Sequence, residues 1–221
     1  MTFALRPGIT LCETGGSIIF LDVDRNRYFG LAGQAEQSFR ALAAAQRPSA
    51  ADHAALLALV RQGVLVNCAD AAPPCAWPAG PSPARSLLDV PGNATASAVV
   101  GAFAQLAASR LMLKTRPFGA LLATLKRRKS MLRPARCEEM PILAGTAAAF
   151  RLTALVAGSL DLCLPRSLAL AHRLLDQGVA ADLVIGVRVR PFAAHCWVRH
   201  GSLLINESRD QVRNFTPILA I

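Results

Sequence analysis

Apolar positions gather in two short runs near the start of the chain. Residues 17–23 and 28–31 are rich in Ile, Leu, Val and aromatic side chains, and the polar residues 24–26 separate them. Short apolar runs of this kind on either side of turn residues predict a β-hairpin. The residues that follow have helical spacing instead.

Two helices are predicted after the hairpin, over residues 35–46 and 50–62. Ser49 is a suitable N-cap for the second helix, and Gly63 is a suitable residue to end it. A short strand follows the second helix. The order strand, strand, helix, helix, strand predicts a small winged-helix-like module over residues 1–67.

Prolines are frequent in the segment that follows this module. Residues 68–93 contain six prolines, and this composition predicts a linker between two domains. Residues 94–221 then show helical segments followed by strand-like runs, an order typical of an α+β domain with an antiparallel sheet. The helices are predicted at residues 94–113, 118–128, 141–158 and 160–178, and the strands at 181–190, 193–200 and 202–208.

The chain is strongly basic, with a formal charge of +10 at pH 7. Such a surface suits nucleic acid, an acidic membrane face or an acidic peptide. A nucleic-acid-binding winged helix is disfavoured, because residues 1–67 hold six Lys or Arg against five Asp or Glu, whereas a DNA-reading module carries a basic stripe. Positive charge is concentrated in residues 125–136, either as a solvated helix end or as a docking surface.

The six cysteines are scattered without a CxxC pair, and the four histidines lack metal-ligand spacing. This pattern disfavours a structural zinc site. No secretory signal opens the chain, and no apolar run reaches the length of a membrane span. We therefore expect free thiols and a cytoplasmic protein with no metal.

Cys163 is the candidate nucleophile. It lies two residues before Pro165, and proline favours the first turn of a helix. The unpaired N–H groups of a helix N-terminus stabilise a thiolate, which is the nucleophilic form of cysteine. Arg166 adds positive charge nearby. The alternative is a buried, inert cysteine.

His195 is the candidate base, at the beginning of a predicted strand. From that position it can reach the mouth of a helix packed on the sheet. By alternation Trp197 shares its face of the strand, whereas Cys196 points to the opposite face, into the core. A buried core histidine is the alternative. His172 is a weaker candidate, because it lies about 13 Å along its helix from Cys163.

The third member of the site depends on the hairpin that follows His195. A three-residue loop around Gly201 pairs His195 with Glu207, whereas a two-residue loop pairs it with Asn206 or Ser208. We favour Glu207, with Asn206 as its rival, because a carboxylate accepts the imidazole N–H and fixes the productive tautomer. The alternative is that Glu207 is an ordinary surface charge outside any site.

The segments CLPRSLAL, LVIGV, PFAAHCWV and INE resemble the B protein of lasso-peptide biosynthesis, a transglutaminase-like cysteine peptidase. The resemblance covers residues 140–221 and implies a papain/transglutaminase-like fold for residues 94–221. It implies a triad of Cys163, His195 and Glu207, although the acid is often aspartate in that family. The implied reaction removes the leader from the core of a precursor peptide, before ring closure.

The same resemblance implies partners. A precursor leader is the substrate, an asparagine-synthetase-like cyclase closes the ring, and an export transporter is a further possible partner. No nucleic acid is expected. Any ATP dependence would enter through the cyclase, since the chain has no GxxxxGK[ST] loop and no cofactor of its own is expected. The helical segment 94–136 is our candidate for docking the cyclase or the transporter.

The N-terminal module resembles the leader-recognition element of ribosomal peptide pathways, with room for two of its usual three helices. The resemblance implies a leader that adds as a strand to the hairpin edge and lies against the last helix. For three of the candidate contacts, a place in the core is the alternative: Phe29, Leu57 and Val60. The full set of candidate contacts is Tyr28, Phe29 and Leu31 on the strand, and Leu57, Val60 and Arg61 on the helix.

Two other functions fit the same residues. A non-catalytic module could deliver the leader, but such a module would have little need of both Cys163 and His195. An acyl transferase on the same fold would use the same triad with an amine in place of water. The residues themselves leave hydrolysis and acyl transfer open.

Overall fold

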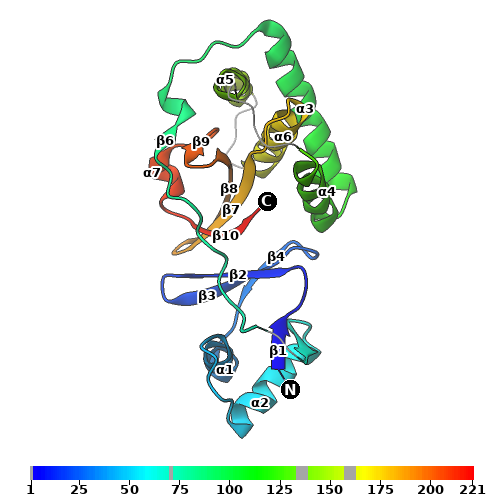
Figure 1. The fold of residues 1–221 in the computed structure, drawn as a ribbon, viewed down its shortest axis with the longest axis vertical. Helices are drawn as coiled ribbons and strands as arrows, with labels where there is room; N and C mark the ends of the chain where they lie inside the picture. Colours follow the sequence, from blue (N-terminus) through cyan, green and yellow to red (C-terminus); the bar gives the residue numbers. More distant parts are fainter. Residues whose placement is uncertain (1, 70–71, 133–138, 157–162) are drawn as a thin grey trace. The chain divides into compact units, whose positions relative to one another are not determined.

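The computed structural model describes residues 2–69, 72–132, 139–156 and 163–221 (Figure 1). The chain divides into two compact units, Met1–Pro78 and Ala79–Ile221. The division falls inside the predicted proline-rich linker. Parts of four predicted segments lie outside the described residues, namely residues 70–71 of the linker, the end of the basic run, the end of the third helix and the first residues of the fourth helix.

The N-terminal unit contains two small antiparallel sheets. The three-stranded sheet includes the predicted hairpin, in which Asp22 pairs with Arg27 next to the turn. The sequence pattern does not predict the first two strands, because Arg6, Pro7 and Gly8 interrupt their short apolar pattern. The strands are β1 (Thr2–Leu5) paired with β5 (Leu65–Cys68), and β2 (Ile9–Thr14), β3 (Ser17–Asp22) and β4 (Arg27–Gly30) in that order.

Two helices complete this unit, α1 (Gly33–Ala43) and α2 (Ala50–Arg61). Ser49 caps α2 as predicted, and its hydroxyl and the Asp52 carboxylate form a reciprocal capping box. The core is built around Phe20, which stacks on one aromatic ring and meets another edge-on. The two-helix count agrees with the sequence analysis, and the winged-helix-like architecture stays a prediction.

The C-terminal unit combines helices with one five-stranded sheet, which confirms the predicted α+β class. The strands are antiparallel except for the β6–β9 pair. The sequence pattern does not predict two of these strands, since β6 has only two residues in a proline-rich stretch and β10 contains Pro217. The sheet order is β10 (Thr216–Ala220), β7 (Asp182–Val189), β8 (Phe192–His200), β9 (Leu203–Leu204) and β6 (Arg85–Ser86).

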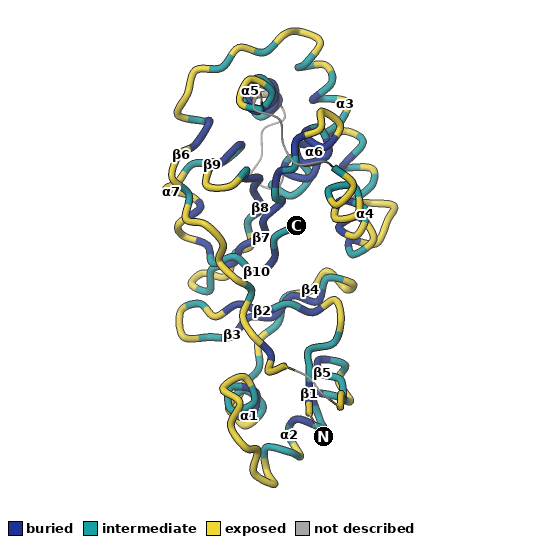
Figure 2. The backbone as a smooth tube through the Cα atoms, in the orientation of Figure 1, coloured by how far each residue is buried: buried dark blue, intermediate teal, exposed yellow. Residues whose placement is uncertain are grey.

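Helix α6 (Cys163–Asp176) lies at the centre of this unit. It packs against β7 and β8 and against three other helices, so most residues from Ser167 to Leu175 are buried on all sides (Figure 2). Gly178, with φ of 82°, follows it as the predicted C′ residue. The other helices are η1 (Leu87–Asp89), α3 (Ala96–Thr115), α4 (Phe118–Ser130), α5 (Glu139–Val156) and the short α7 (Arg209–Val212).

Helix α3 corrects one expectation. By length and composition alone it could cross a membrane, although no run of that length is expected from the sequence. Its apolar residues are interspersed with many alanines, which make the run less conspicuous. In the structure α3 packs on α5 and α6 and buries Ala102, Leu106 and Ser109.

Candidate active site

Cys163 is the first residue of α6, as the proline two positions later predicts. The backbone N–H groups of Leu164 and Cys196 and the imidazole of His195 act on its sulfur and lower the pKa of the thiol. Burial raises the pKa of the thiol, but the hydrogen bond and charge of His195 and the two N–H groups outweigh it, so the pKa is lowered overall. The position therefore favours a thiolate.

His195 lies on β8, directly opposite Gly186 of β7. Its ring stacks near Trp197, with centroids 6.2 Å apart, and lies 5.1 Å from the ring of Phe215. Burial lowers the pKa of the imidazole, but its hydrogen bonds to Cys163 and Glu207 and their negative charges raise it to about 9. The local environment thus favours an imidazolium facing a thiolate.

Glu207 is the acid that contacts this imidazole. Its Oε2 lies 2.6 Å from His195 Nε2, which leaves Nδ1 for the interaction with Cys163. Burial raises the pKa of Glu207, but the hydrogen bond to His195, the Ser208 N–H that donates to Oε1 and the charges of His195 and Arg166 lower it overall. The carboxylate therefore stays ionised and can hold the imidazolium in place.

The hairpin register that led to Glu207 is wrong. Arg199 pairs with Leu204 and His200 with Leu203, so the loop has two residues, with Gly201 first at φ of 59°. If this register continued, Ser208 would face His195. The ladder instead ends at β9, and the chain turns away so that Glu207 reaches the imidazole from outside the sheet.

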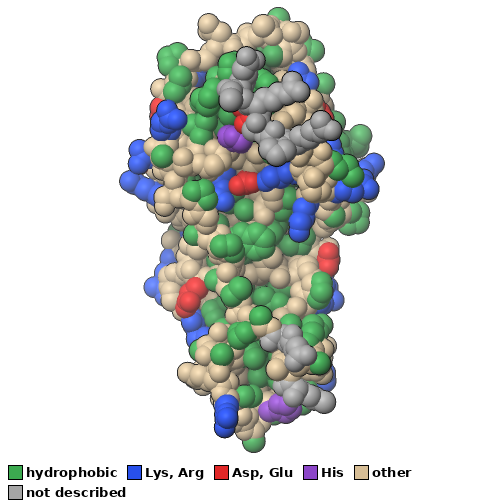
Figure 3. Space-filling model, viewed as in Figure 1, with side chains coloured by type: hydrophobic (Ala, Val, Ile, Leu, Met, Phe, Trp, Pro, Cys, Tyr) green, Lys and Arg blue, Asp and Glu red, His purple; other side chains and the backbone are tan. Residues whose placement is uncertain are grey.

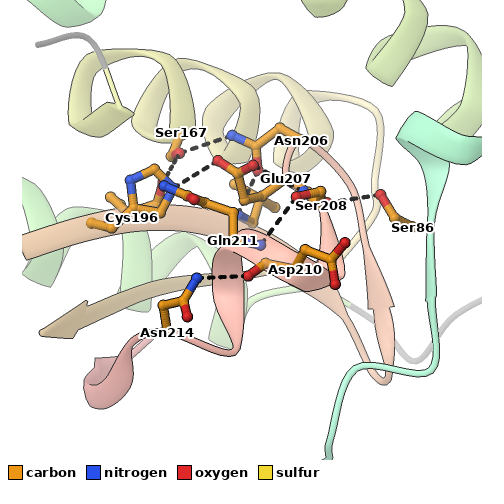
Figure 4. A network of polar contacts seen from close by, with 11 residues as sticks. Ser86, Ser167, Cys196, Asn206, Glu207, Ser208, Asp210, Gln211 and Asn214 are labelled. Atoms are coloured by element: carbon orange, nitrogen blue, oxygen red, sulfur yellow. Dashed lines mark hydrogen bonds and ion pairs between the residues drawn. The ribbon is translucent and has the colours of Figure 1, made fainter. Parts of the chain in front are cut away.

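Asn206, the rival for the third position, has a different role. Its Oδ1 accepts a hydrogen bond from the Val198 N–H at 2.8 Å, and its Nδ2 donates to Ser167 Oγ at 2.9 Å (Figure 4). It is therefore engaged with β8 and α6 instead of with the imidazole. The sequence contained no signal for Ser167, because a serine in a helix interior has many structural uses.

A cleft of about 550 Å³ opens over these groups. Arg166 lines it, one turn after Cys163, and the Nε of this arginine has no hydrogen-bond partner among the described residues. Among the described residues, no group of three or more His, Cys, Asp or Glu side chains could hold a metal ion. The lining consists of Ala154, Cys163, Arg166, His195, Cys196, Asn206, Glu207, Ser208 and Gln211.

The other cysteine and histidine near the site are poor catalysts. Cys196 is buried as predicted, and burial raises the pKa of its thiol far above the usual range. His172 is also buried, and burial and the nearby Arg128 lower the pKa of its imidazole. Neither environment favours the charged form needed for a nucleophile or an ion pair.

Four of the predicted leader contacts pack against the core of the N-terminal unit, namely Phe29, Leu31, Leu57 and Val60. This fits the alternative that Phe29, Leu57 and Val60 are core residues. Phe29 and Leu31 also line a hollow of about 380 Å³ together with residues before β5. Tyr28 lies on β4 opposite Leu21, and Arg61 is exposed at the end of α2.

The basic run on α4 is partly neutralised. Arg128 pairs with Asp176 at 2.5 Å, and Lys129 pairs with Asp182. Lys126 and Arg127 are exposed. On the face drawn in Figure 3, Lys and Arg side chains are dispersed among apolar and neutral ones. A docking surface on α4 would therefore rest on the two exposed cations.

Comparison with known proteins places this site in a family. Residues 102–220 match the family model described as the transglutaminase-like superfamily, and this segment includes Cys163, His195 and Glu207. The chain belongs to the transglutaminase-like superfamily. The match also covers α4 to α7 and strands β7 to β10, so it spans most of the C-terminal unit.

A curated relative adds a narrower similarity. The chain is 46% identical over 59 residues to the microcin J25-processing protein McjB of Escherichia coli. The aligned segment is 27% of this chain and spans only 28% of the length of McjB. No solved structure matches the chain.

Proposed function

We propose that this protein is the leader peptidase of lasso-peptide maturation, a cysteine peptidase that separates the leader of a precursor from its core. The observation that carries the proposal is the alignment of Cys163, His195 and Glu207 in one cleft, in a chain with a segment similar to McjB. The charge distribution supports nucleophilic catalysis, because both the thiolate and the imidazolium are favoured.

The proposed reaction has two steps. The Cys163 thiolate attacks the scissile carbonyl, and the His195 imidazolium gives its proton to the departing amine of the core peptide. The neutral imidazole then takes a proton from water, which attacks the thioester and releases the leader as a carboxylic acid. Cys163 leaves as the thiolate, and the ion pair is restored.

Two features of the fold support this chemistry. The N-terminus of α6 presents backbone N–H groups beside Cys163, and such groups stabilise the oxyanion that forms on the attacked carbonyl. Glu207 keeps the imidazole oriented through its 2.6 Å contact with Nε2. The imidazole therefore presents Nδ1 to the reacting atoms in both steps.

The leader is proposed to bind the N-terminal unit by strand addition. Strand β4 is the last strand of its three-stranded sheet, and peptides can bind by adding a strand to a sheet. Phe29, Leu31 and the exposed Arg27 line the hollow beside it. Arg27→Ala is expected to weaken binding of a labelled leader peptide, measured by fluorescence anisotropy, whereas the exposed Arg47→Ala is the matched control. Equal affinity of the two variants would contradict this placement.

The peptidase is proposed to work in the cytoplasm with an asparagine-synthetase-like cyclase, which closes the ring on the freed core amine. Any ATP dependence belongs to that cyclase. This division of labour is supported by the resemblance to lasso-peptide B proteins and by the McjB similarity.

Mass spectrometry of a lasso precursor, incubated with this protein and its cyclase, tests the proposal. A leader fragment ending in a carboxylic acid is expected with the unaltered protein and with Cys68→Ala, which removes an exposed cysteine of the N-terminal unit. No fragment is expected with Cys163→Ala. Cleavage by Cys163→Ala would refute the proposal, and a leader ending in an amide would indicate acyl transfer.

A further inference from the structure

The backbone of Cys196 meets two residues of α6 that are one turn apart. Its N–H acts on the sulfur of Cys163 and lowers the pKa of that thiol, and its carbonyl accepts a hydrogen bond from Ser167 Oγ at 2.8 Å. Ser167 is fully buried. Residues four positions apart share one face of a helix, so the same face of α6 meets β8 at two points beside His195.

Asn206 connects this contact to the segment that carries the acid. It accepts from the Val198 N–H at 2.8 Å, donates to Ser167 Oγ at 2.9 Å, and directly precedes Glu207 (Figure 4). The side chains of Ser167 and Asn206 therefore connect three segments, namely the start of α6, strand β8 and the residues after β9. These segments carry the nucleophile, the base and the acid.

The donor and acceptor roles in this pair are fully determined. The Ser167 hydroxyl donates to the Cys196 carbonyl, so it receives the Asn206 Nδ2 hydrogen on its lone pair. The side-chain amide of Asn206 cannot be flipped, because its NH₂ would then face the Val198 N–H and two hydrogen-bond donors would oppose each other. An aspartate at 206 would keep the acceptor but lose the donor.

We propose that Ser167 and Asn206 are positioning residues that set the separation between Cys163 and the His195–Glu207 pair. They touch none of the proposed reacting atoms and act through the backbone of β8 and through the start of α6. Their importance for cleavage rests on the proposed function. Their effect on the reactivity of Cys163 does not, because it follows from the hydrogen bonds alone.

The pH dependence of Cys163 alkylation by iodoacetamide tests this proposal without any peptide substrate. The rate is followed by mass spectrometry of the peptide that contains Cys163, so that the other cysteines do not interfere. Ser167→Ala and Asn206→Ala are expected to raise the apparent pKa of Cys163 by about one unit, a loss of about tenfold in rate at low pH. Asn206→Asp is expected to behave like Asn206→Ala.

Two matched controls separate positioning from general stability. Thr153→Ala removes another fully buried hydroxyl, which donates a hydrogen bond to the Phe150 carbonyl within α5. Asn214→Ala removes an exposed amide that bonds the Asp210 carbonyl. Both controls are expected to leave the alkylation profile of Cys163 unchanged. Circular dichroism checks that every variant is folded, and if Ser167→Ala does not fold, the two Asn206 variants decide.

The outcomes distinguish this proposal from the proposed function. A folded Asn206→Ala protein with the unaltered alkylation profile would overturn the positioning role, even if the protein cleaves precursors. A shifted profile in a protein that cleaves no precursor would support the positioning role and count against the peptidase. Equal shifts in Thr153→Ala and Ser167→Ala would assign both effects to stability and overturn the proposal.

Discussion

The indole ring of Trp197 fills the space that a side chain on Gly186 would need. A Cβ atom at position 186 would lie 2.7 Å from Cη2 and 2.8 Å from Cζ3 of that ring, and 3.0 Å from Cβ of Phe215. Both rings contact His195, which pairs with Gly186 across the sheet. The absence of a side chain at 186 therefore supports the orientation of the imidazole.

Gly186→Ala is accordingly expected to destabilise the C-terminal unit by about 1–3 kcal/mol, because overpacking a filled core forces rings or backbone to move. Gly145→Ala is the control, since a Cβ there meets nothing within 4 Å and alanine favours a helix interior by about 0.5–1 kcal/mol. Urea unfolding measures both. Equal stability of the two variants would contradict the packing account.

The proposed peptidase activity is expected to follow a bell-shaped pH profile. Activity rises as Cys163 loses its proton, at a pH below the usual value of 9.0 for a thiol, and falls as the His195 imidazolium loses its proton near pH 9. The rate of precursor cleavage between pH 5 and 10 measures the two limbs. A profile that only rises through pH 9 would indicate an ordinary thiol without an imidazolium partner.

Glu207→Gln removes the negative charge beside His195 Nε2 and is expected to lower the pKa of the imidazole below about 9, which moves the alkaline limb of the profile to lower pH. Cleavage is expected to slow by about 10²-fold or more, as for the loss of an orienting group in acid–base catalysis. Asp210→Asn makes the same change on an exposed carboxylate of α7 and is expected to leave the cleavage rate and its pH profile unchanged. Similar rates for both variants would remove Glu207 from the site.

Stability is expected to depend on pH through the same pair. The pKa of His195 is raised from 6.5 to about 9 in the folded state, so its contribution to stability is fully present below pH 6.5 and is lost as the pH rises through 9. Glu207 has a lowered pKa, so its contribution is present above pH 4.5 and is lost as the pH falls through its folded value. Urea unfolding of the unaltered protein and of His195→Gln, at pH 6 and pH 10, should show a difference that shrinks at the higher pH.

Charge reversal on α4 tests the proposed docking of a partner cyclase. Lys126→Glu with Arg127→Glu changes two exposed cations, so the fold is expected to be unaffected while complex formation with the cyclase weakens. Size-exclusion chromatography of the mixture measures the complex. Reversal at Arg47, an exposed arginine outside the segment 94–136, serves as the control. Complete retention of the complex by the double variant would rule out these two residues as the contact.

Local patterns in the sequence predicted most of the elements around the site. Pro165 placed the start of α6, Gly178 placed its end, and strand alternation put Trp197 on the face of His195. These features depend on residues close together in the chain. The N-cap at Ser49 and the first hairpin could be predicted for the same reason.

Relationships between distant segments could not be predicted in this way. The contact between Glu207 and His195 was expected from a three-residue loop, whereas the loop has two residues and therefore a different register. Glu207 still reaches His195 because the ladder ends early and the chain bends. Strands β6 and β10 depend on partners far along the chain and have little apolar pattern of their own. The roles of Ser167 and Asn206 became visible only when α6 and β8 were placed together.

The strand that precedes the family match has a consequence for where this protein can be cut. Ser86, on β6, donates a hydrogen bond to the backbone carbonyl of Glu207 at 2.7 Å, and the buried Arg199 binds the carbonyls of Ala79 and Pro81. A truncated protein that starts at the first matched residue, 102, would lose these attachments and leave an edge of β9 uncovered. The shortest fragment suited to kinetics or crystallisation therefore begins no later than residue 79. Proteolytic nicking between 79 and 90 should abolish the proposed activity even if the rest of the C-terminal unit stays intact.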